Sequence, residues 1–486
     1  MSRYIKNVFT LCLVTMICTT GIQAYPVVHS ALGDSLVIPG KLTLRLITKH
    51  QNYEGGNAAT RDTDIDSPKS VNFTPDGRKY YVNSLEGCCT VVFDAATHKK
   101  LKVISHKFDG TETQLWGEKS KFFPFRHYFE NVNCFLGKPV EGTFSHGGRY
   151  FWVPYYRRTF DINAQDPSAL CVIDTEKDEI VRLMETGPLP KMVTTSHDGR
   201  RLAVTHWGDN TVGIINIEGN DPFAWRYESC PAITKKLILN YSLTNQIDRD
   251  SDSGLKLRGT VFLPGDSLLL VSRMCGAGGF GVVDVKHGKY LGMLTGMLEN
   301  TRHMIVSGDY LYLSCNIDGY VQRIRIADLL KGIRQLRSPD CKKSSELGRT
   351  ASVQGFTTCK VNPGARTICI SPDGRWIFAA CNSSSSLVIV DAQQMKVVGS
   401  IKADSFPVGL DISPDGRWLI TTSQGRSNGG GNAVDVFEIT TVQPDFSFLP
   451  ALLQYIPDIL IAPSCSIPLC ANLVGLIDDA GLTLIA

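Results

Sequence analysis

The turn sequence SPDGRW occurs twice, at 371–376 and again at 413–418, 42 positions later. Its proline presets the backbone for a tight turn, its aspartate can hydrogen-bond the turn backbone, and its glycine accepts a positive φ. Alternating apolar and polar residues precede each copy (TICI, GLDI) and follow it (WIFAAC, WLITTS). Because side chains of a half-buried strand alternate with a period of two, each copy predicts a strand, a tight turn and a second strand.

A third apolar stretch follows both copies at a fixed offset, so the repeated unit is a small antiparallel sheet. Degraded copies of this unit extend through the chain and bring the number of units to seven. Their inner-strand and turn stretches are VNFTPDG (71–77), GTFSHGG (142–148), VTTSHDG (193–199), TVFLPGD (260–266), MIVSGD (304–309), ICISPDG (368–374) and LDISPDG (410–416). A period of about 40 residues with several strands per unit is typical of β-propeller blades. The sequence therefore predicts an all-β fold, a seven-bladed β-propeller of four-stranded antiparallel blades.

The last unit lacks a fourth strand of its own. An unassigned strand-like stretch, KLTLRLIT (41–48), lies before the first unit. We expect this stretch to complete the last blade as its outer strand and so to close the ring, which removes open sheet edges. The predicted organisation is an N-terminal segment at 25–66, a propeller at 67–441 and a tail at 442–486.

Both ends of the chain differ from the repeats. Arg3 and Lys6 precede the apolar run VFTLCLVTMIC, and a small residue ends the segment 1–24, which predicts a removable export signal. We therefore expect a periplasmic, cell-envelope or extracellular protein. The tail at 442–486 contains prolines within an uncharged stretch, and these argue against a simple membrane-spanning helix. Packing on the propeller or a short helical appendage is the expected role of the tail.

The charge and the cysteine content of the chain argue against several classes of function. The net charge of the 486 residues is only +3, so no global field favours nucleic acid or a membrane surface. The 15 cysteines include no C-x-x-C motif and no zinc-type or c-type haem spacing, so neither a metal nor a cofactor is expected. Cysteines inside predicted strands suit small buried apolar residues, while Cys88-Cys89, Cys341/Cys359 and Cys465/Cys470 are open to pairing in an oxidising compartment.

Three units carry insertions. These lie at 107–137, 219–234 and 331–352, and they are rich in aromatic, basic or serine residues. Such segments either cap one face of the ring or pack on the outer edge of the blades.

A basic residue recurs at one position of the repeat. Five positions before the residue that opens each turn stand Lys69, Val140, Lys191, Arg258, Arg302, Arg366 and Val408. Inner strands surround the central channel of a propeller, so five of seven basic residues at one depth predict a positively charged ring at its mouth. A partly desolvated concave ring of like charge attracts small anions or acidic side chains.

The loop after each second strand is expected to reach the same face. The loops would add Tyr155, Tyr156, Arg157, Arg158, His206, Trp207 and Arg273 to the ring. Aromatic planes beside guanidinium groups suit a ligand with a carboxylate or phosphate and an apolar or sugar part. Alternatively, the cations pair with acids such as Glu141 and Asp209. His206 is open to a role as general base but is equally a candidate for a structural histidine.

The stretches TTSHDGRRLAVTHWGDNTVGIINI (194–217) and ISPDGRWIFAACNSSSSLVIVDAQQMKVVGSI (370–401) resemble the YVTN-type repeat propellers, also described as YncE-like and related to the lactonase-like propeller superfamily. This resemblance implies an exported seven-bladed propeller. Relatives include lactone hydrolases, the haem d1 propeller of nitrite reductases and surface proteins that bind macromolecules. His146 and His197 replace the turn proline of the repeat, and no catalytic residue is carried over.

Two functions from different classes follow. The first is a non-enzymatic binding or scaffold protein, a monomer without cofactor, that holds an anionic small molecule or a protein partner at the channel mouth. The alternative is a lactonase-like hydrolase that uses the same basic mouth to polarise a carbonyl.

Overall fold

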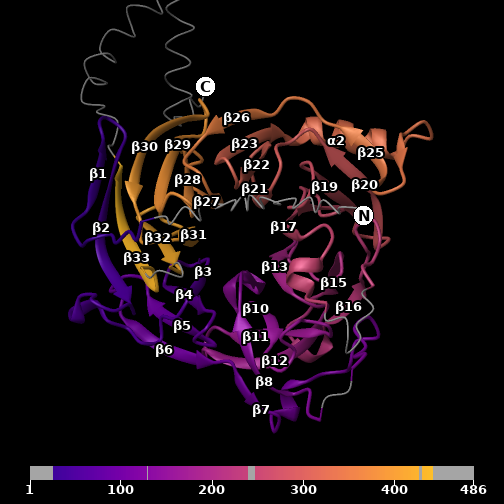
Figure 1. The fold of residues 1–486 in the computed structure, drawn as a ribbon, viewed down its shortest axis with the longest axis horizontal. Helices are drawn as coiled ribbons and strands as arrows, with labels where there is room; N and C mark the ends of the chain where they lie inside the picture. The colour runs from indigo at the N-terminus through magenta and orange to yellow at the C-terminus, as the bar shows by residue number, and fades with distance from the viewer. Residues whose placement is uncertain (1–25, 128–129, 239–246, 426–429, 442–486) are drawn as a thin grey trace, which may run out of the picture. The chain divides into compact units, whose positions relative to one another are not determined.

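The structure is a computed structural model that describes residues 26–127, 130–238, 247–425 and 430–441. The predicted export signal and the whole of the predicted tail at 442–486 lie outside the described residues. Residues up to Thr440 form one compact unit. In this unit seven antiparallel sheets follow one another in chain order around a common centre (Figure 1). The prediction of an all-β, seven-bladed propeller is confirmed.

The first three blades keep the strand order of the sequence repeat. Blade 1 contains β3 (Pro68–Phe73), β4 (Lys79–Ser84), β5 (Cys89–Asp94) and β6 (Lys100–Ser105). Blade 2 contains β9 (Thr143–Ser145), β10 (Tyr150–Arg158), β11 (Ser168–Asp174) and β12 (Glu179–Thr186), and its sheet is extended by β8 (Cys134–Pro139) and β7 (Lys107–Asp109). Blade 3 contains β13 (Pro190–Thr195), β14 (Arg201–His206), β15 (Thr211–Asn216) and β16 (Arg226–Ser229).

The next three blades repeat this arrangement. Blade 4 contains β17 (Leu257–Phe262), β18 (Leu268–Arg273), β19 (Phe280–Asp284) and β20 (Lys289–Thr295), extended by β25 (Gly348–Ser352) and β24 (Lys343–Ser344). Blade 5 contains β21 (Thr301–Ser307), β22 (Tyr310–Cys315), β23 (Tyr320–Arg325) and β26 (Thr357–Lys360). Blade 6 contains β27 (Ala365–Ile370), β28 (Trp376–Cys381), β29 (Ser386–Asp391) and β30 (Lys396–Lys402).

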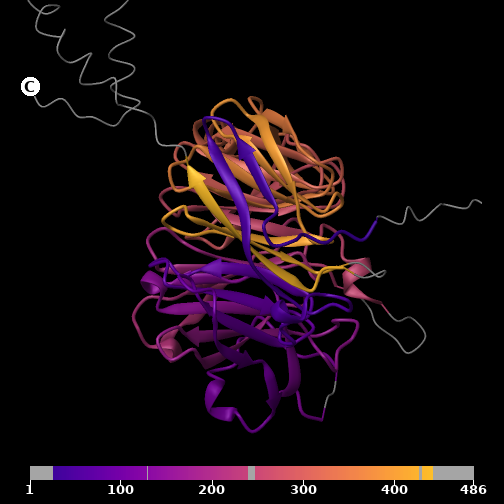
Figure 2. The same cartoon turned by 90° about the vertical axis from the view of Figure 1, so that its left-hand side faces the viewer.

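Blade 7 is built from both ends of the propeller. It contains β31 (Pro407–Ile412), β32 (Trp418–Ser423) and β33 (Ala433–Thr441), followed by β2 (Leu42–Gln51) and β1 (Ser35–Ile38). Figure 2 shows the indigo N-terminal strands alongside the yellow β33. The prediction that 41–48 closes the ring is thus confirmed, and β1 adds a further edge strand.

The apolar core lies between neighbouring blades. One cluster joins Phe378 of blade 6 to Leu44 and Phe437 of blade 7, and others join successive blade pairs in the same way. Because both faces of a blade pack on neighbours, middle strands such as β11 are buried along their whole length. The repeated turns form as predicted: the Trp376 amide donates to Ser371 Oγ at 2.9 Å, and Gly374 has φ +71°.

The short helices belong to the connections between strands. They are η1 (Ala58–Thr60), η2 (Thr113–Leu115), η3 (His146–Gly148), η4 (Pro222–Ala224), α1 (Arg249–Asp252) and α2 (Ile326–Arg337). The amphipathic α2 buries Leu329, Ile333 and Leu336 against blades 4 and 5.

None of the helices in the described residues is long and apolar enough to cross a membrane. The described cysteines, including Cys88, Cys89, Cys341 and Cys359, are unpaired.

Candidate functional site

The basic ring is created by a repeated backbone irregularity. In six of the seven inner strands the pairing with the second strand shifts at the ring position, for example between Pro68 and Ser70 and between Ala365 and Thr367. Such a β-bulge leaves one residue out of the ladder and re-aims its side chain. The bulges therefore turn the ring residues out of the sheet at the face where the inner strands begin, opposite the SPDG turns.

Hydroxyl groups of neighbouring blades fix the bulged backbone. Ser314 Oγ of blade 5 donates to the Arg366 carbonyl at 2.6 Å, and Thr205 Oγ1 of blade 3 donates to the Arg258 carbonyl at 3.1 Å. Ser70 Oγ bonds the Val140 carbonyl at 3.0 Å in the same manner. Each of these ring residues is thus anchored to two blades, which holds the ring at a constant depth.

Four ring residues line one cavity of about 140 Å³ in the central channel. They are Lys69, Arg258, Arg302 and Arg366, and the wall also includes Val408, Glu141, His303 and Asp411. Because each comes from a different blade, the cations surround the cavity. The structure therefore brings together four of the five basic residues that the repeat singled out.

Glu141 is the internal counter-ion of the ring. Its carboxylate pairs with the guanidinium of Arg258, as the sequence allowed. Burial alone would raise the pKa of Glu141, but the charges of Arg258, Lys69 and Arg366 lower this pKa to about 2. One permanently ionised carboxylate thus faces four basic side chains.

The other basic side chains of the cavity, Lys69, Arg302 and Arg366, form no ion pair with a carboxylate among the described residues. Burial, followed by repulsion from Arg258 and Arg302, places the pKa of Arg366 well below its usual value. Burial and the Arg366 charge do the same for Lys69, and burial lowers the pKa of Arg302 to about 9. The Arg366 Nε is buried and has no hydrogen-bond partner among the described residues. An anion in the cavity would relieve each of these penalties.

Lys191 lies apart from the other ring residues. Its ammonium nitrogen is 3.7 Å from the centre of the Tyr156 ring, 4.5 Å from that of Trp207 and 3.7 Å from Asp250 Oδ1. Burial lowers the pKa of Lys191 to about 7. Asp250 belongs to α1, which follows the third blade. Lys191, Tyr156 and Trp207 thus form an aromatic box that is not part of the lining of the central cavity.

Three residues expected at the mouth turn into the blades instead. Tyr155, His206 and Arg273 occupy the same register, at the end of the second strand opposite the residue before the ring position. The Tyr155 hydroxyl bonds His106 Nδ1 at 2.9 Å, and His206 Nδ1 bonds Thr211 Oγ1 at 2.8 Å. The structure therefore places them in the packing between strands, away from the cavity.

Arg158 is likewise a packing residue rather than a mouth residue. Its guanidinium carbon lies 4.9–5.1 Å from the ring centres of Trp116, Phe125 and Phe135, and Nη2 donates to the Ser168 carbonyl at 3.3 Å. The residue is 1% exposed. Its neighbour Arg157 is half-buried and stacks on Tyr156 at 4.6 Å.

Replacing Arg158 by methionine tests this assignment. The Arg158→Met protein is expected to lose about 1–3 kcal/mol of unfolding free energy, because the carbonyls of Val132 and Ser168 lose a buried donor. Urea unfolding measures the loss. Anion affinity at the channel should stay unchanged, and a large fall in that affinity would return Arg158 to the mouth.

The sequence analysis missed Asn72 and Asp411, which line the deeper part of the cavity. Asp411 accepts the Phe73 amide of the next blade at 2.8 Å, and burial raises the pKa of Asp411 to about 7. Both residues stand three positions after a ring residue, so the alignment that revealed the ring contained the signal for this second layer.

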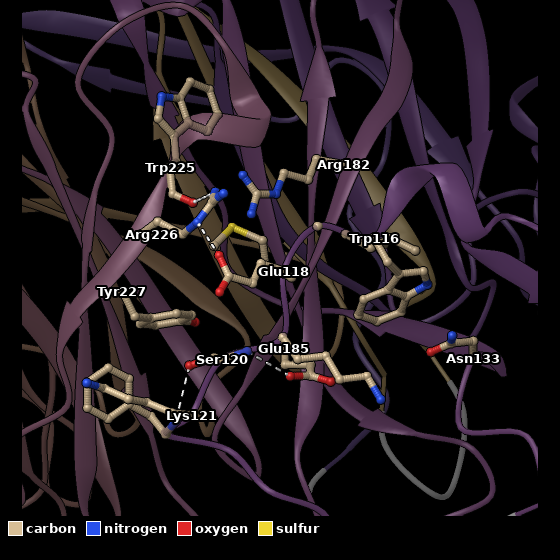
Figure 3. Close-up of a pocket in the computed structure, with 15 residues that line it drawn as sticks. Trp116, Glu118, Ser120, Lys121, Asn133, Arg182, Glu185, Trp225, Arg226 and Tyr227 are labelled. Carbon is tan, nitrogen blue, oxygen red and sulfur yellow. Dashed lines mark hydrogen bonds and ion pairs between the residues drawn. The ribbon is translucent and has the colours of Figure 1, made fainter.

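Two insertions meet at a second cavity, of about 390 Å³, on the outer edge of blades 2 and 3 (Figure 3). Trp116 bridges to Leu183 of β12, and Tyr227 comes from β16. Glu118 pairs with Arg226 at 3.3 Å, and the Ser120 amide donates to Glu185 at 3.4 Å. The insertion at 219–234 and the part of 107–137 around Trp116 thus pack on the outer edge of the blades, whereas β7 and β8 of the same insertion extend blade 2 at the opposite edge, beyond β10.

Many solved structures are similar to this chain, and two of them serve as examples. One is hydrazine synthase of Kuenenia stuttgartiensis, with a TM-score of 0.51, 12% identity and coverage of 81% of this chain and 99% of that chain. The other is the β-propeller domain of Cps50 (Swd1) from Myceliophteria thermophila, with a TM-score of 0.51, 10% identity and coverage of 77% and 97%. The fold is that of a β-propeller. At these identities the likeness shows the fold and no activity. No model of a known protein family matches the chain, and no curated protein sequence does.

Proposed function

We propose that this propeller is a non-enzymatic binding protein that holds a small anion in its central channel. The observation that carries the proposal is the cavity in which Lys69, Arg258, Arg302 and Arg366 face one ionised carboxylate, that of Glu141. Converging cations in a partly desolvated hollow focus a positive potential on its contents.

The volume of the cavity limits the ligand. At about 140 Å³ the cavity is comparable to the roughly 150 Å³ cavity that holds benzene, so about six non-hydrogen atoms fit. Guanidinium groups bind planar carboxylates and phosphates through two parallel hydrogen bonds. Inorganic phosphate and short carboxylates are therefore the ligand class that we propose, in preference to a ligand with a large apolar part.

The setting of this activity is also a proposal. The segment 1–24 has the features of an export signal, and the repeats resemble those of exported YVTN-type propellers. We place the anion-binding protein in the cell envelope or outside the cell. A protein partner that inserts an acidic side chain into the channel would use the same cations.

A charge reversal in the ring tests the proposal. We expect phosphate or acetate to raise the melting temperature of the full chain by mass action, because the anion binds only the folded state. The double variant Arg258→Glu/Arg366→Glu should lose this shift. Since the carboxylate introduced by Arg258→Glu would face that of Glu141, the milder Arg302→Gln/Arg366→Gln variant serves as a second test, with an expected weakening of at least tenfold.

The matched control carries the same charge change on the opposite face. Arg375 and Arg417 are exposed residues of the SPDGRW turns, so Arg375→Glu/Arg417→Glu should keep the anion-dependent shift. Equal affinity in the ring variants and this control would remove the channel from the proposal. Hydrolysis of a lactone by the wild type, lost in the ring variants, would support the lactonase-like alternative instead.

A further inference from the structure

The ring closure contains a buried cluster of one lysine and two aspartates. Lys49 belongs to β2, Asp435 to the adjacent β33, and Asp404 to the loop between β30 and β31. Residues of the N-terminal segment cover the cluster: the Val28 amide donates to Ser405 Oγ at 2.8 Å, and Ser30 lies against both aspartates. The cluster thus joins the first described residues to the last blade.

The three side chains touch one another away from water. The Lys49 side chain is 4% exposed and both aspartate side chains are fully buried. Lys49 Nζ contacts the Asp404 carboxylate directly and lies 3.4 Å from Asp435 Oδ1. His29 Nδ1 also lies 3.1 Å from Asp404 Oδ1, and burial, followed by the Lys49 charge, lowers the pKa of His29, which favours its neutral form. With a neutral His29, two carboxylates and one ammonium leave a net negative charge, which low-dielectric surroundings disfavour.

The contacts of Ser30 point to a proton on one of the two carboxyls. Ser30 Oγ lies 2.6 Å from Asp404 Oδ2 and 2.7 Å from Asp435 Oδ2. A hydroxyl has one hydrogen to donate, so a proton on a carboxyl oxygen would make both contacts hydrogen bonds. Burial and the Asp404 charge raise the pKa of Asp435 to about 7, which makes Asp435 the proton carrier.

The cluster therefore contains an amine that contacts the oxygens of two carboxyl groups, one of which can carry a proton. Burial lowers the pKa of Lys49, but the charges of Asp435 and Asp404 raise it above its ordinary value. The ion pair of Lys49 with Asp404 is therefore the resting form. Transfer of one proton within the contact converts the ion pair into a neutral amine and a carboxylic acid. Groups held in this way react with effective molarities of about 10⁵–10⁸ M when well aligned.

We propose that Lys49 and Asp404 form an intramolecular isopeptide bond, with Asp435 carrying the proton. The neutral Lys49 nitrogen attacks Cγ of the Asp404 carboxylic acid. Asp435 gives its proton to the departing hydroxyl and takes one from the nitrogen, so that one N–C bond forms, one C–O bond breaks, one water leaves and Asp435 ends protonated as it began. No group is oxidised or reduced.

The bond would fasten the ring covalently. Lys49 and Asp404 are separated by 355 positions, and the described cysteines form no disulfide. A cross-link across so long a loop restricts the unfolded chain strongly. Opening of the closing strand β2 would then no longer unravel the last blade.

Peptide mapping of the full-length protein tests the bond. Trypsin does not cut after an acylated lysine, so a linked protein should yield residues 46–61 and 403–417 as one branched peptide, lighter by one water than the sum of the two. Digestion after complete denaturation removes any effect of folding. Cleavage after Lys49 together with a linear 403–417 peptide, from protein that had melted cooperatively, would overturn the proposal.

Variants of the cluster residues, with an internal control, test the roles of Lys49, Asp404 and Asp435 in forming the bond. Asp435→Asn keeps the shape of the side chain but cannot carry the proton, so its tryptic peptides should be linear, as should those of Lys49→Arg. The half-exposed pair Lys41–Asp391, with a 3.5 Å contact, should stay unlinked in every sample. A branched peptide in Asp435→Asn would overturn the role of Asp435, and a link from Lys49 to the peptide that contains Asp435 would overturn that of Asp404.

Discussion

Replacing Glu141 by glutamine is expected to lower the free energy of unfolding by about 3–5 kcal/mol in a buffer without binding anions, because a buried charge loses its partner. Arg258 then has no carboxylate in contact among the described residues. The repulsion of Arg366 and Lys69 by the other basic side chains of the ring is no longer offset by the Glu141 charge. Glutamine keeps the size of the side chain, so the loss reports charge rather than a cavity. Urea unfolding in acetate-free, phosphate-free buffer measures it.

The same variant should respond to phosphate more strongly than the wild type. An anion in the channel supplies the missing counter-charge, so saturating phosphate should restore most of the lost stability. Sodium chloride at equal ionic strength controls for screening. Glu118→Gln, which removes an exposed carboxylate 3.3 Å from Arg226, should change stability by less than about 0.5 kcal/mol. A Glu141→Gln protein as stable as the wild type would show that the ring needs no counter-ion.

The blades could be predicted from sequence because their signals are local. The turns in the two SPDGRW copies are fixed by hydrogen bonds within five residues, and similar turn sequences recur in the other units, with a shorter turn at 307–310. The closing strand could be predicted because an unpaired fourth position in blade 7 required a partner. The ring position followed from the alignment, since the bulge occurs at the same place in six of the inner strands and so does not change their relative depth.

Side-chain direction at the mouth could not be predicted in the same way. His206 and Tyr155 lie on second strands opposite the residue before the ring position, and their side chains point into the blade, whereas the loop pattern suggested the channel. Lys191 departs from the ring because its partner Asp250 lies outside the repeat, and a contact over such a distance leaves no periodic signal.

Acidification from about pH 6.5 toward pH 4 is expected to destabilise the propeller through its buried histidines. Burial lowers the pKa of His98, His206 and His303 to about 4 and that of His106 to about 3, against an ordinary value of 6.5. The neutral rings therefore contribute stability above pH 6.5, and this contribution is lost as the pH falls, because only the unfolded chain takes up the protons.

Two buried carboxyls act in the opposite direction. Burial raises the pKa of Asp411 to about 7, and burial is also the largest cause that raises the pKa of Asp435 to about 7. Each binds a proton in the folded state at pH 4.5–6, where the unfolded carboxyl is ionised, so each stabilises the fold as the pH falls. Among these six described groups, unfolding takes up four protons and releases two.

These six groups together contribute a net uptake of two protons to the slope of stability against pH. One proton corresponds to about 1.4 kcal/mol per pH unit, so the six groups should lower the free energy of unfolding by about 2.7 kcal/mol per unit between about pH 6 and pH 4.5. Urea titrations at fixed pH values of the wild type and of variants measure these contributions. His98→Phe removes one uptake site, and since neither ring nitrogen of His98 has a hydrogen-bond partner in the described part of the chain, the slope should drop by about 1.4 kcal/mol per pH unit. Asp411→Asn removes one release site and should steepen the slope by the same amount. Slopes that move in the same direction in both variants would contradict the assignment of opposite roles to these two groups.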